Sequence, residues 1–286
     1  MNINRNFLGV ALLTVSILLA VSPAYAGAVY AASSSNITNL GLTLKGSASY
    51  SGFSISTSSA SLSASSAGGA DALDAPAACL GCDYNNAFTA HGASATPYAY
   101  GDALFAGNLL NGTASLSAIA EASQNSAPGS ASATNTLLGF LSVTAPGSQF
   151  GISFSALPYL GVDLVSGLAG AANLSFIVTL SDLFGSSIFT WVPNGVSGDV
   201  VGGTELADSF NLNQGVSQLL TPGTSDFNPV TGNFSAESDP LAAGFYQLSI
   251  AVSNSAFVTA VPEPSMPALF ALGFAGLMLI SRRKRV

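Results

Sequence analysis

The sequence predicts an all-β protein whose body is a β-sandwich of the jelly-roll kind. Three observations support this: short runs alternate apolar and polar residues, turn-forming residues separate these runs, and Ser, Thr and Gly are abundant. Alternation with a period of two is typical of strands that bury one face. A long amphipathic helix with capping residues is not evident in the body. An open barrel or a solenoid is the alternative architecture.

Residues 1–26 are predicted to be a signal peptide that adopts a helix. Arg5 precedes an apolar run from Phe7 to Val21, and Ala24-Tyr25-Ala26 supplies a small-x-small cleavage site. A charged start, an apolar core and small residues at the cut are the features that signal peptidase recognises. A second possible cut lies near Ala31, and an uncleaved N-terminal anchor is the alternative interpretation. Export of residues 27–260, the body, is therefore expected.

The clearest strand pattern in the body runs from Phe245 to Val252. Residues at alternating positions here are apolar, and Asn254-Ser255 predicts a turn into a last strand from Phe257 to Val261. The remaining runs predicted as strands are Leu40–Lys45, Tyr50–Ser56, Ala103–Leu110, Ala114–Ala120, Phe150–Leu157, Asn173–Leu180 and Ile188–Val192. Many short strands separated by turns favour a sandwich over a parallel sheet.

Two segments of the body depart from this pattern. Residues 47–70 are rich in Ser, Ala and Gly, which predicts either a pair of small-residue strands or a flexible surface segment. Phe53 and Ile55 favour a strand for the first half. Gly161–Ala172 is small and apolar, and we interpret it as a short helix or a loop beneath the sheet.

The body is acidic and almost free of basic residues. All 14 acidic residues lie between Asp71 and Glu263, whereas Lys45 is the only basic residue outside the two ends of the chain. Such a surface cannot neutralise phosphates, which excludes nucleic acid as a partner. Binding to an anionic membrane surface is disfavoured for the same reason. Ser, Thr, Asn and Gly must supply solubility, as suits a protein of the cell surface or extracellular matrix.

Cys79 and Cys82 are predicted to form a disulfide. They are the only two cysteines, and an exported chain normally oxidises such a pair. Because C-x-x-C closes a very small loop, the gain in stability is modest. Two alternatives remain: a redox pair, and a metal site with His91 and a carboxylate. Neither the βαβ pattern of a redox site nor a fourth defined metal ligand accompanies the motif.

No catalytic residues are assigned, and we expect the protein not to be an enzyme. His91 is the only histidine, and no G-x-S-x-G motif accompanies it. A pair of carboxylates could in principle cleave glycosidic bonds. The candidates are Asp71, Asp74, Asp83, Glu121, Glu205 and Asp208. Acidic residues are numerous enough in this chain for such pairs to arise by chance.

No cofactor is expected, with calcium as the alternative. Asp226-x-Asn228, followed by Asn233, Glu237 and Asp239, makes an oxygen-rich segment that we interpret as a loop. Val230 occupies the third ligand position of an EF-hand, so that loop type does not fit. Trp191, the only tryptophan, is interpreted as a core residue rather than a platform for sugars.

The C-terminal residues 261–286 carry the most specific pattern in the chain. An acidic motif with two prolines, Val261-Pro262-Glu263-Pro264-Ser265, precedes an apolar run, residues 266–280, and a basic end, Arg282-Arg283-Lys284-Arg285. The prolines fix an extended backbone. As a transmembrane helix the run spans about 22 Å, which is short against about 30 Å of hydrocarbon. The basic end favours the cytoplasmic side. A buried or amphipathic C-terminal helix is the alternative.

This tail resembles the PEP-CTERM sorting domain of Gram-negative bacteria. The resemblance is confined to residues 261–286, and it implies processing by exosortase, a membrane transpeptidase-like enzyme. It further implies a precursor held transiently in the inner membrane and a product in the cell envelope or outside the cell. Proteins of this kind are associated with exopolysaccharide and biofilm, but their bodies are diverse, so the tail implies no particular activity.

Two functions for the body follow from these observations. A non-catalytic structural or adhesive β-domain fits the sparse charge and the Ser/Gly-rich strands. The alternative is a carbohydrate-binding or carbohydrate-active sandwich linked to exopolysaccharide, which needs aromatic residues and carboxylates gathered on one sheet face. An exposed groove with Trp191 beside two carboxylates would favour sugar chemistry, whereas a buried Trp191 would count against that version of it.

Overall fold

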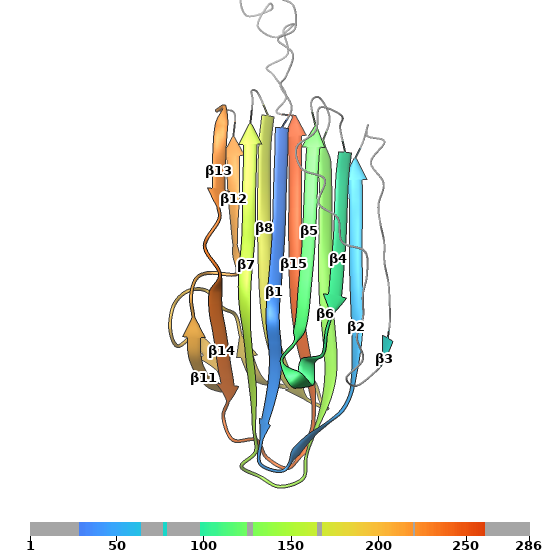
Figure 1. Ribbon diagram of the computed structural model, residues 1–286, viewed down its shortest axis with the longest axis vertical. Helices are drawn as coiled ribbons and strands as arrows, with labels where there is room; N and C mark the ends of the chain where they lie inside the picture. Colours follow the sequence, from blue (N-terminus) through green and yellow to red (C-terminus); the bar gives the residue numbers. More distant parts are fainter. Residues whose placement is uncertain are drawn as a thin grey trace, which may run out of the picture.

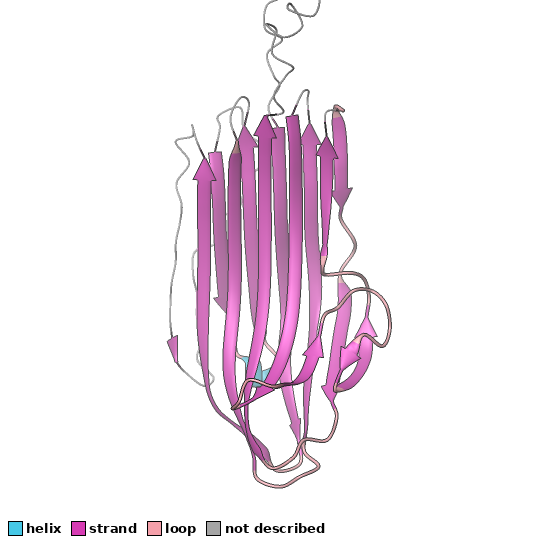
Figure 2. Cartoon of the chain, turned by 180° about the vertical axis from the view of Figure 1, so that it is seen from behind, coloured by secondary structure: helices cyan, strands magenta, loops and turns pink. Residues whose placement is uncertain are grey.

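A computed structural model shows two antiparallel sheets packed face to face (Figures 1 and 2). It describes residues 29–63, 77–78, 98–124, 128–164, 168–219 and 221–260. The predicted signal peptide and sorting tail lie outside these ranges. Within them, the prediction of an all-β sandwich is confirmed, while its jelly-roll connectivity stays a prediction. None of the described helical segments is long and apolar enough to span a membrane.

Sheet A contains seven strands of the described chain. Its order is β11 (Gly203–Asp208), β14 (Gly232–Ser238), β7 (Gln149–Leu164), β1 (Val29–Lys45), β5 (Ala114–Gln124) and β4 (Tyr98–Ala106), and β13 (Gly223–Phe227) also pairs with β7. A single 3₁₀ turn, η1 (Leu109–Asn111), lies between β4 and β5. It ends the predicted strand Ala103–Leu110 early, because Asn108 caps the turn through its side chain.

Sheet B contains the other eight described strands. Its order is β10 (Val200–Val201), β9 (Ser187–Trp191), β8 (Leu168–Asp182), β15 (Gly244–Ala260), β6 (Gly129–Val143), β2 (Ala48–Ser63) and β3 (Ala77–Ala78), and β12 (Gln214–Leu219) also pairs with β8. Consecutive strands often lie in different sheets. Chain segments far apart in sequence therefore become neighbours.

The strands are much longer than the sequence predicts, and two predicted breaks are wrong. β15 continues through Asn254 without the expected turn, because the Asn254 side chain is buried and bonded to sheet A. Gly161–Ala172 is not a helix or an unbroken loop, since β7 extends to Leu164 and β8 begins at Leu168. Gly170 allows close packing there: a Cβ atom on it would lie 2.7 Å from Val162 Cγ1.

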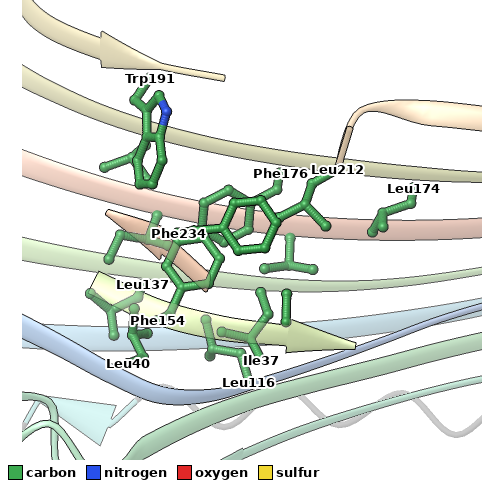
Figure 3. Close-up of a cluster of buried hydrophobic side chains, with 14 of the residues drawn as sticks. Ile37, Leu40, Leu116, Leu137, Phe154, Leu174, Phe176, Trp191, Leu212 and Phe234 are labelled. Atoms are coloured by element: carbon green, nitrogen blue, oxygen red, sulfur yellow. The ribbon is translucent and has the colours of Figure 1, made fainter. Parts of the chain in front are cut away.

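The core changes in composition along the strands. At the end where β1 begins, the sheets meet through small residues such as Ala31, Ala120 and Ala133. Asn135 and Asn254 also reach from sheet B here and donate to backbone carbonyls of sheet A. Toward the other end, large buried side chains fill the space, as Figure 3 shows around Phe154. Burial of these apolar side chains holds the two sheets together.

Both ends of the described chain leave the sandwich at the small-residue end (Figure 1). Tyr30, at the start of β1, pairs with Asp163 near the end of β7. Ala260, at the end of β15, pairs with Leu168, at the start of β8. Because β7 ends only a few residues before β8 begins, the two chain ends lie at the same end of the body. At about 3.3 Å per residue, the 17 residues of β15 extend roughly 56 Å away from it.

Candidate functional site

Most of the sequence-predicted site residues lie outside the part that the structure describes. These are the sorting motif Val261–Ser265, the basic residues Arg282–Arg285, the predicted disulfide Cys79–Cys82, and His91, Asp71, Asp74 and Asp83. The disulfide and its alternatives stay predictions.

Trp191 is a core residue, as predicted. Its side chain is 0% exposed, and its ring packs 5.7 Å from that of Phe154. The indole Nε1 donates a hydrogen bond of 2.7 Å to Glu205 Oε1, which satisfies the polar atom of the buried ring. Trp191 therefore cannot be a platform for a sugar, and its burial counts against the version of the carbohydrate hypothesis that uses it.

Glu205 and Asp208 do lie together, but both Glu205 oxygens and Asp208 Oδ2 accept hydrogen bonds from the chain itself. Glu205 Oε2 accepts from the Gly198 amide, and Asp208 Oδ2 accepts from the amides of Asn194 and Gly195, all within 2.9 Å. Burial raises the pKa of Asp208, the two amides lower it, and the neighbouring Glu205 raises it further. This pair fixes the loop after β9, which is a structural role.

Glu121 belongs to a different group, on the outer face of sheet A. It is buried on β5 and accepts a 2.6 Å hydrogen bond from Tyr30 Oη. Burial, followed by this bond to Glu121, raises the pKa of Tyr30 above the ordinary range of tyrosine. Tyr100 donates similarly to Asp102 on β4. Sequence patterns did not indicate these tyrosine–carboxylate pairs. Tyr30 and Glu121 are far apart in the chain, and Tyr100 and Asp102 share a face only because β4 is a strand.

The oxygen-rich segment interpreted as a loop, with calcium as the alternative, is largely strand, with Asn228 and Asp239 in connections, and its acidic residues are spread apart. Asp226 pairs with Gly161 on β7 and Glu237 with Gly151, which puts them about 33 Å apart along the strand. Glu237 also forms an ion pair of 2.6 Å with Lys45. They cannot share one ion. Among the described residues, no group of three His, Cys, Asp or Glu side chains is placed to hold a metal.

The outer face of sheet A also carries a shallow concavity of about 400 Å³, here called the trough. Side chains from β5, β1 and β7 line it, with one residue after β13. They are Ser34, Ser35, Asn36, Ser117, Ile119, Leu157, Pro158, Tyr159 and Asn228. The lining is mostly apolar, carries no charge, and holds hydroxyl and amide groups from four chain segments. Small-molecule sites in proteins combine these properties.

Comparisons with known proteins give one firm assignment and little about the body. No curated protein matches the chain in sequence. Among solved structures, those of infectious bursal disease virus Gx and Gt strains are 11% and 13% identical over 90% and 92% of this chain and 75% of each viral chain. Their TM-score is 0.11, which supports no structural inference.

The family comparison concerns only the C-terminal end. Residues 260–285 match the PEP-CTERM protein-sorting motif, which confirms the resemblance drawn from the proline-framed acidic motif, the apolar run and the basic end. The motif implies export and processing at the membrane by an exosortase-type enzyme. The chain thus carries a PEP-CTERM protein-sorting motif, and it is an exported protein by that motif.

Proposed function

We propose that this protein is a non-catalytic structural or adhesive component of the cell envelope or extracellular matrix. The tail holds the precursor in the inner membrane until an exosortase-type enzyme processes it. The body is then retained in the envelope or released. Exopolysaccharide and biofilm matrix are the surroundings in which such a body would act.

One observation carries this proposal: the last strand leads directly into the sorting motif. β15 ends at Ala260, and the motif match begins at that residue. Val29 leaves the body at the same end, close to where the signal peptide precedes it. A body tethered in this way extends about 56 Å from its attachment point, with its aromatic-rich end outermost.

The interior of the body also supports a non-catalytic role. Apolar side chains fill the space between the sheets, and the buried amides of Asn135 and Asn254 form hydrogen bonds with sheet A. The acidic pair beside Trp191 is engaged in holding a loop. A rigid sandwich with a filled interior is suited to presenting a stable outer surface to a binding partner.

Sorting can be tested in a Gram-negative host that encodes an exosortase. The full chain is compared with a variant in which Pro262, Glu263 and Pro264 are all alanine, and with Pro222→Ala, an exposed proline of the body, as control. An antibody to the body follows both proteins through cell fractions. The variant should accumulate in the inner membrane with its C-terminus intact, whereas the wild type and control should reach the outer fractions or medium. Equal distribution of all three proteins would refute the sorting mechanism.

The structural or adhesive role needs its own measurement. Deleting the gene should lower the retention of cells or polysaccharide on a surface under flow, and the Pro222→Ala protein should restore it. If the deletion strain retains cells and polysaccharide to the same extent as the parent strain, the proposed role of the body is wrong, even if the sorting mechanism is correct.

A further inference from the structure

The trough exists because the strand along one edge of β7 is interrupted. β13 pairs with residues 160–164 of β7, and β14 pairs with residues 151–156. Leu157, Pro158 and Tyr159 have no strand partner on that edge within the described chain. Two prolines explain the interruption, since Pro158 lies opposite the break and Pro229 lies within the connection from β13 to β14. Proline supplies no backbone N–H, so it cannot continue a ladder there.

Tyr159 provides an aromatic surface at one end of the trough. A Cβ atom placed on Gly161 would lie 2.3 Å from Tyr159 Oη and 2.9 Å from Cε1. The Tyr159 ring must therefore extend along the sheet over Gly161, and it needs a glycine there to do so. The ring lies against the strand at Gly161, and the residue as a whole is half-buried, so part of it is accessible. A ring held against a sheet in this way is a rigid platform for the C–H face of a sugar.

Amide and hydroxyl groups lie beside this platform. Asn36 on β1 and Asn228 in the connection after β13 are both exposed, and both residues line the trough. Ser117 Oγ donates to Asn36 Oδ1 at 3.1 Å, which orients that amide. Sugar hydroxyls both donate and accept hydrogen bonds, so amide groups serve them well.

The charge around the trough selects against acidic polymers. No charged residue lines it, and the ionisable residues on neighbouring positions of this face are acidic: Asp102 pairs with Ile119, and Asp163 and Asp226 are exposed near Tyr159. Asp226 pairs with Gly161, over which the Tyr159 ring lies, and burial raises the pKa of Tyr159, with Asp226 and Asp163 raising it further. Lys45, the body's only cation, is engaged with Glu237. Uronic or sulfated polysaccharides would meet repulsion without a compensating cation.

We infer that the trough binds a short segment of an uncharged polysaccharide, with Tyr159 stacking on a sugar ring and Asn36 and Asn228 bonding its hydroxyls. This inference deepens the proposed adhesive function and rests on it, because it names the site and the chemical class of the partner. A volume of about 400 Å³ lies within the range of small-ligand sites, at its smaller end. The site therefore recognises only a few rings at a time, and several copies of the protein would share one polymer.

The test is affinity electrophoresis of the full chain in mild detergent, in gels containing dextran, galactomannan or hydroxyethylcellulose, with alginate as the anionic comparison. At least one uncharged polymer should retard the protein, and alginate should not. Tyr159→Ala should weaken that binding about tenfold, whereas Tyr159→Phe keeps the ring and should stay within about twofold of wild type. Phe245→Ala is the matched control, since Phe245 is an exposed aromatic residue on the outer face of sheet B.

The outcomes are distinguishable. Failure of all three uncharged polymers, stronger retardation by alginate, or equal losses for Tyr159→Ala and Phe245→Ala would overturn the inference. Trp191 fluorescence reports whether Tyr159→Ala folds. If it does not fold, Asn36→Ala tests the site instead, because Asn36 is exposed, and its affinity for the polymer should fall several-fold. Sorting is measured separately by cell fractionation, so binding can fail while sorting succeeds, and the reverse.

Discussion

Replacing Phe154 by leucine should destabilise the body strongly, because Phe154 joins strands from both sheets. Its ring is 3% exposed and lies 4.7 Å from Phe176, 5.1 Å from Phe234 and 5.7 Å from Trp191, measured between ring centroids. Each aromatic pair contributes about 0.5–1.5 kcal/mol beyond the area that it buries. Loss of three pairs, with leucine retaining most of the apolar contact, predicts a decrease of about 3 kcal/mol in the free energy of unfolding.

Urea unfolding followed by fluorescence measures this change well, because Trp191 is the only tryptophan and lies within the same cluster. Phe245→Leu serves as the control, since its ring is 60% exposed and the change should cost less than about 0.5 kcal/mol. The slope of the transition should be similar for both variants. A loss for Phe154→Leu within about 0.5 kcal/mol of the control would refute the idea that this cluster holds the sheets together.

Two further predictions concern polar groups and pH. Asp208 has a raised pKa in the folded body, so its contribution to stability is fully present below the unfolded pKa and is lost as pH rises through the folded one. Asp208→Asn should therefore flatten the decline in stability between about pH 4 and 7 seen in urea titrations; an unchanged profile would contradict this. Tyr50 has a buried Oη without a partner in the described structure, and burial raises its pKa. Tyr50→Phe should leave the free energy of unfolding unchanged or raise it by up to about 1 kcal/mol. It should also reduce the loss of stability as pH rises past about 10. Clear destabilisation at pH 7 would show that the Tyr50 hydroxyl does form a hydrogen bond.

The sandwich could be predicted because burial of one strand face leaves a period-two pattern in the sequence. Where that pattern uses large side chains, as from Phe245 to Val252, the strand was found. β6 was missed, although it alternates regularly between buried and half-buried residues. Its buried positions include Ala131, Ala133 and Asn135, which do not differ enough in hydropathy from the Ser and Thr between them. Small side chains suffice where two sheets lie close together.

Asn254 shows why a local signal can mislead. Asparagine favours turns when its side chain bonds to nearby backbone. Here Asn254 Oδ1 accepts from Ser35 Oγ at 2.9 Å, and its Nδ2 donates to the Ala118 carbonyl. Both partners belong to sheet A and lie far away in sequence, so the strand continues.

The candidate site could not be predicted as a unit. The sequence drew attention to Asn228 as a calcium ligand and to Phe150–Leu157 as a strand, but it did not connect them with Asn36 or Ser117. Register between β5, β1 and β7 brings these residues together, and single-sequence patterns do not specify register over such distances. The prolines at 158 and 229 were the available signal, since each predicts a break in pairing.

The position of β15 has a mechanical consequence. This strand carries the sorting tail, and it is paired with β6 from Gly244 to Val258 and with β8 from Tyr246 to Ala260. A force applied at Ala260 along the strand axis would act in shear on both ladders, loading many hydrogen bonds at once instead of peeling them apart in sequence. A body held by its tail and pulled at its far end would therefore resist extraction of the strand through which the load passes.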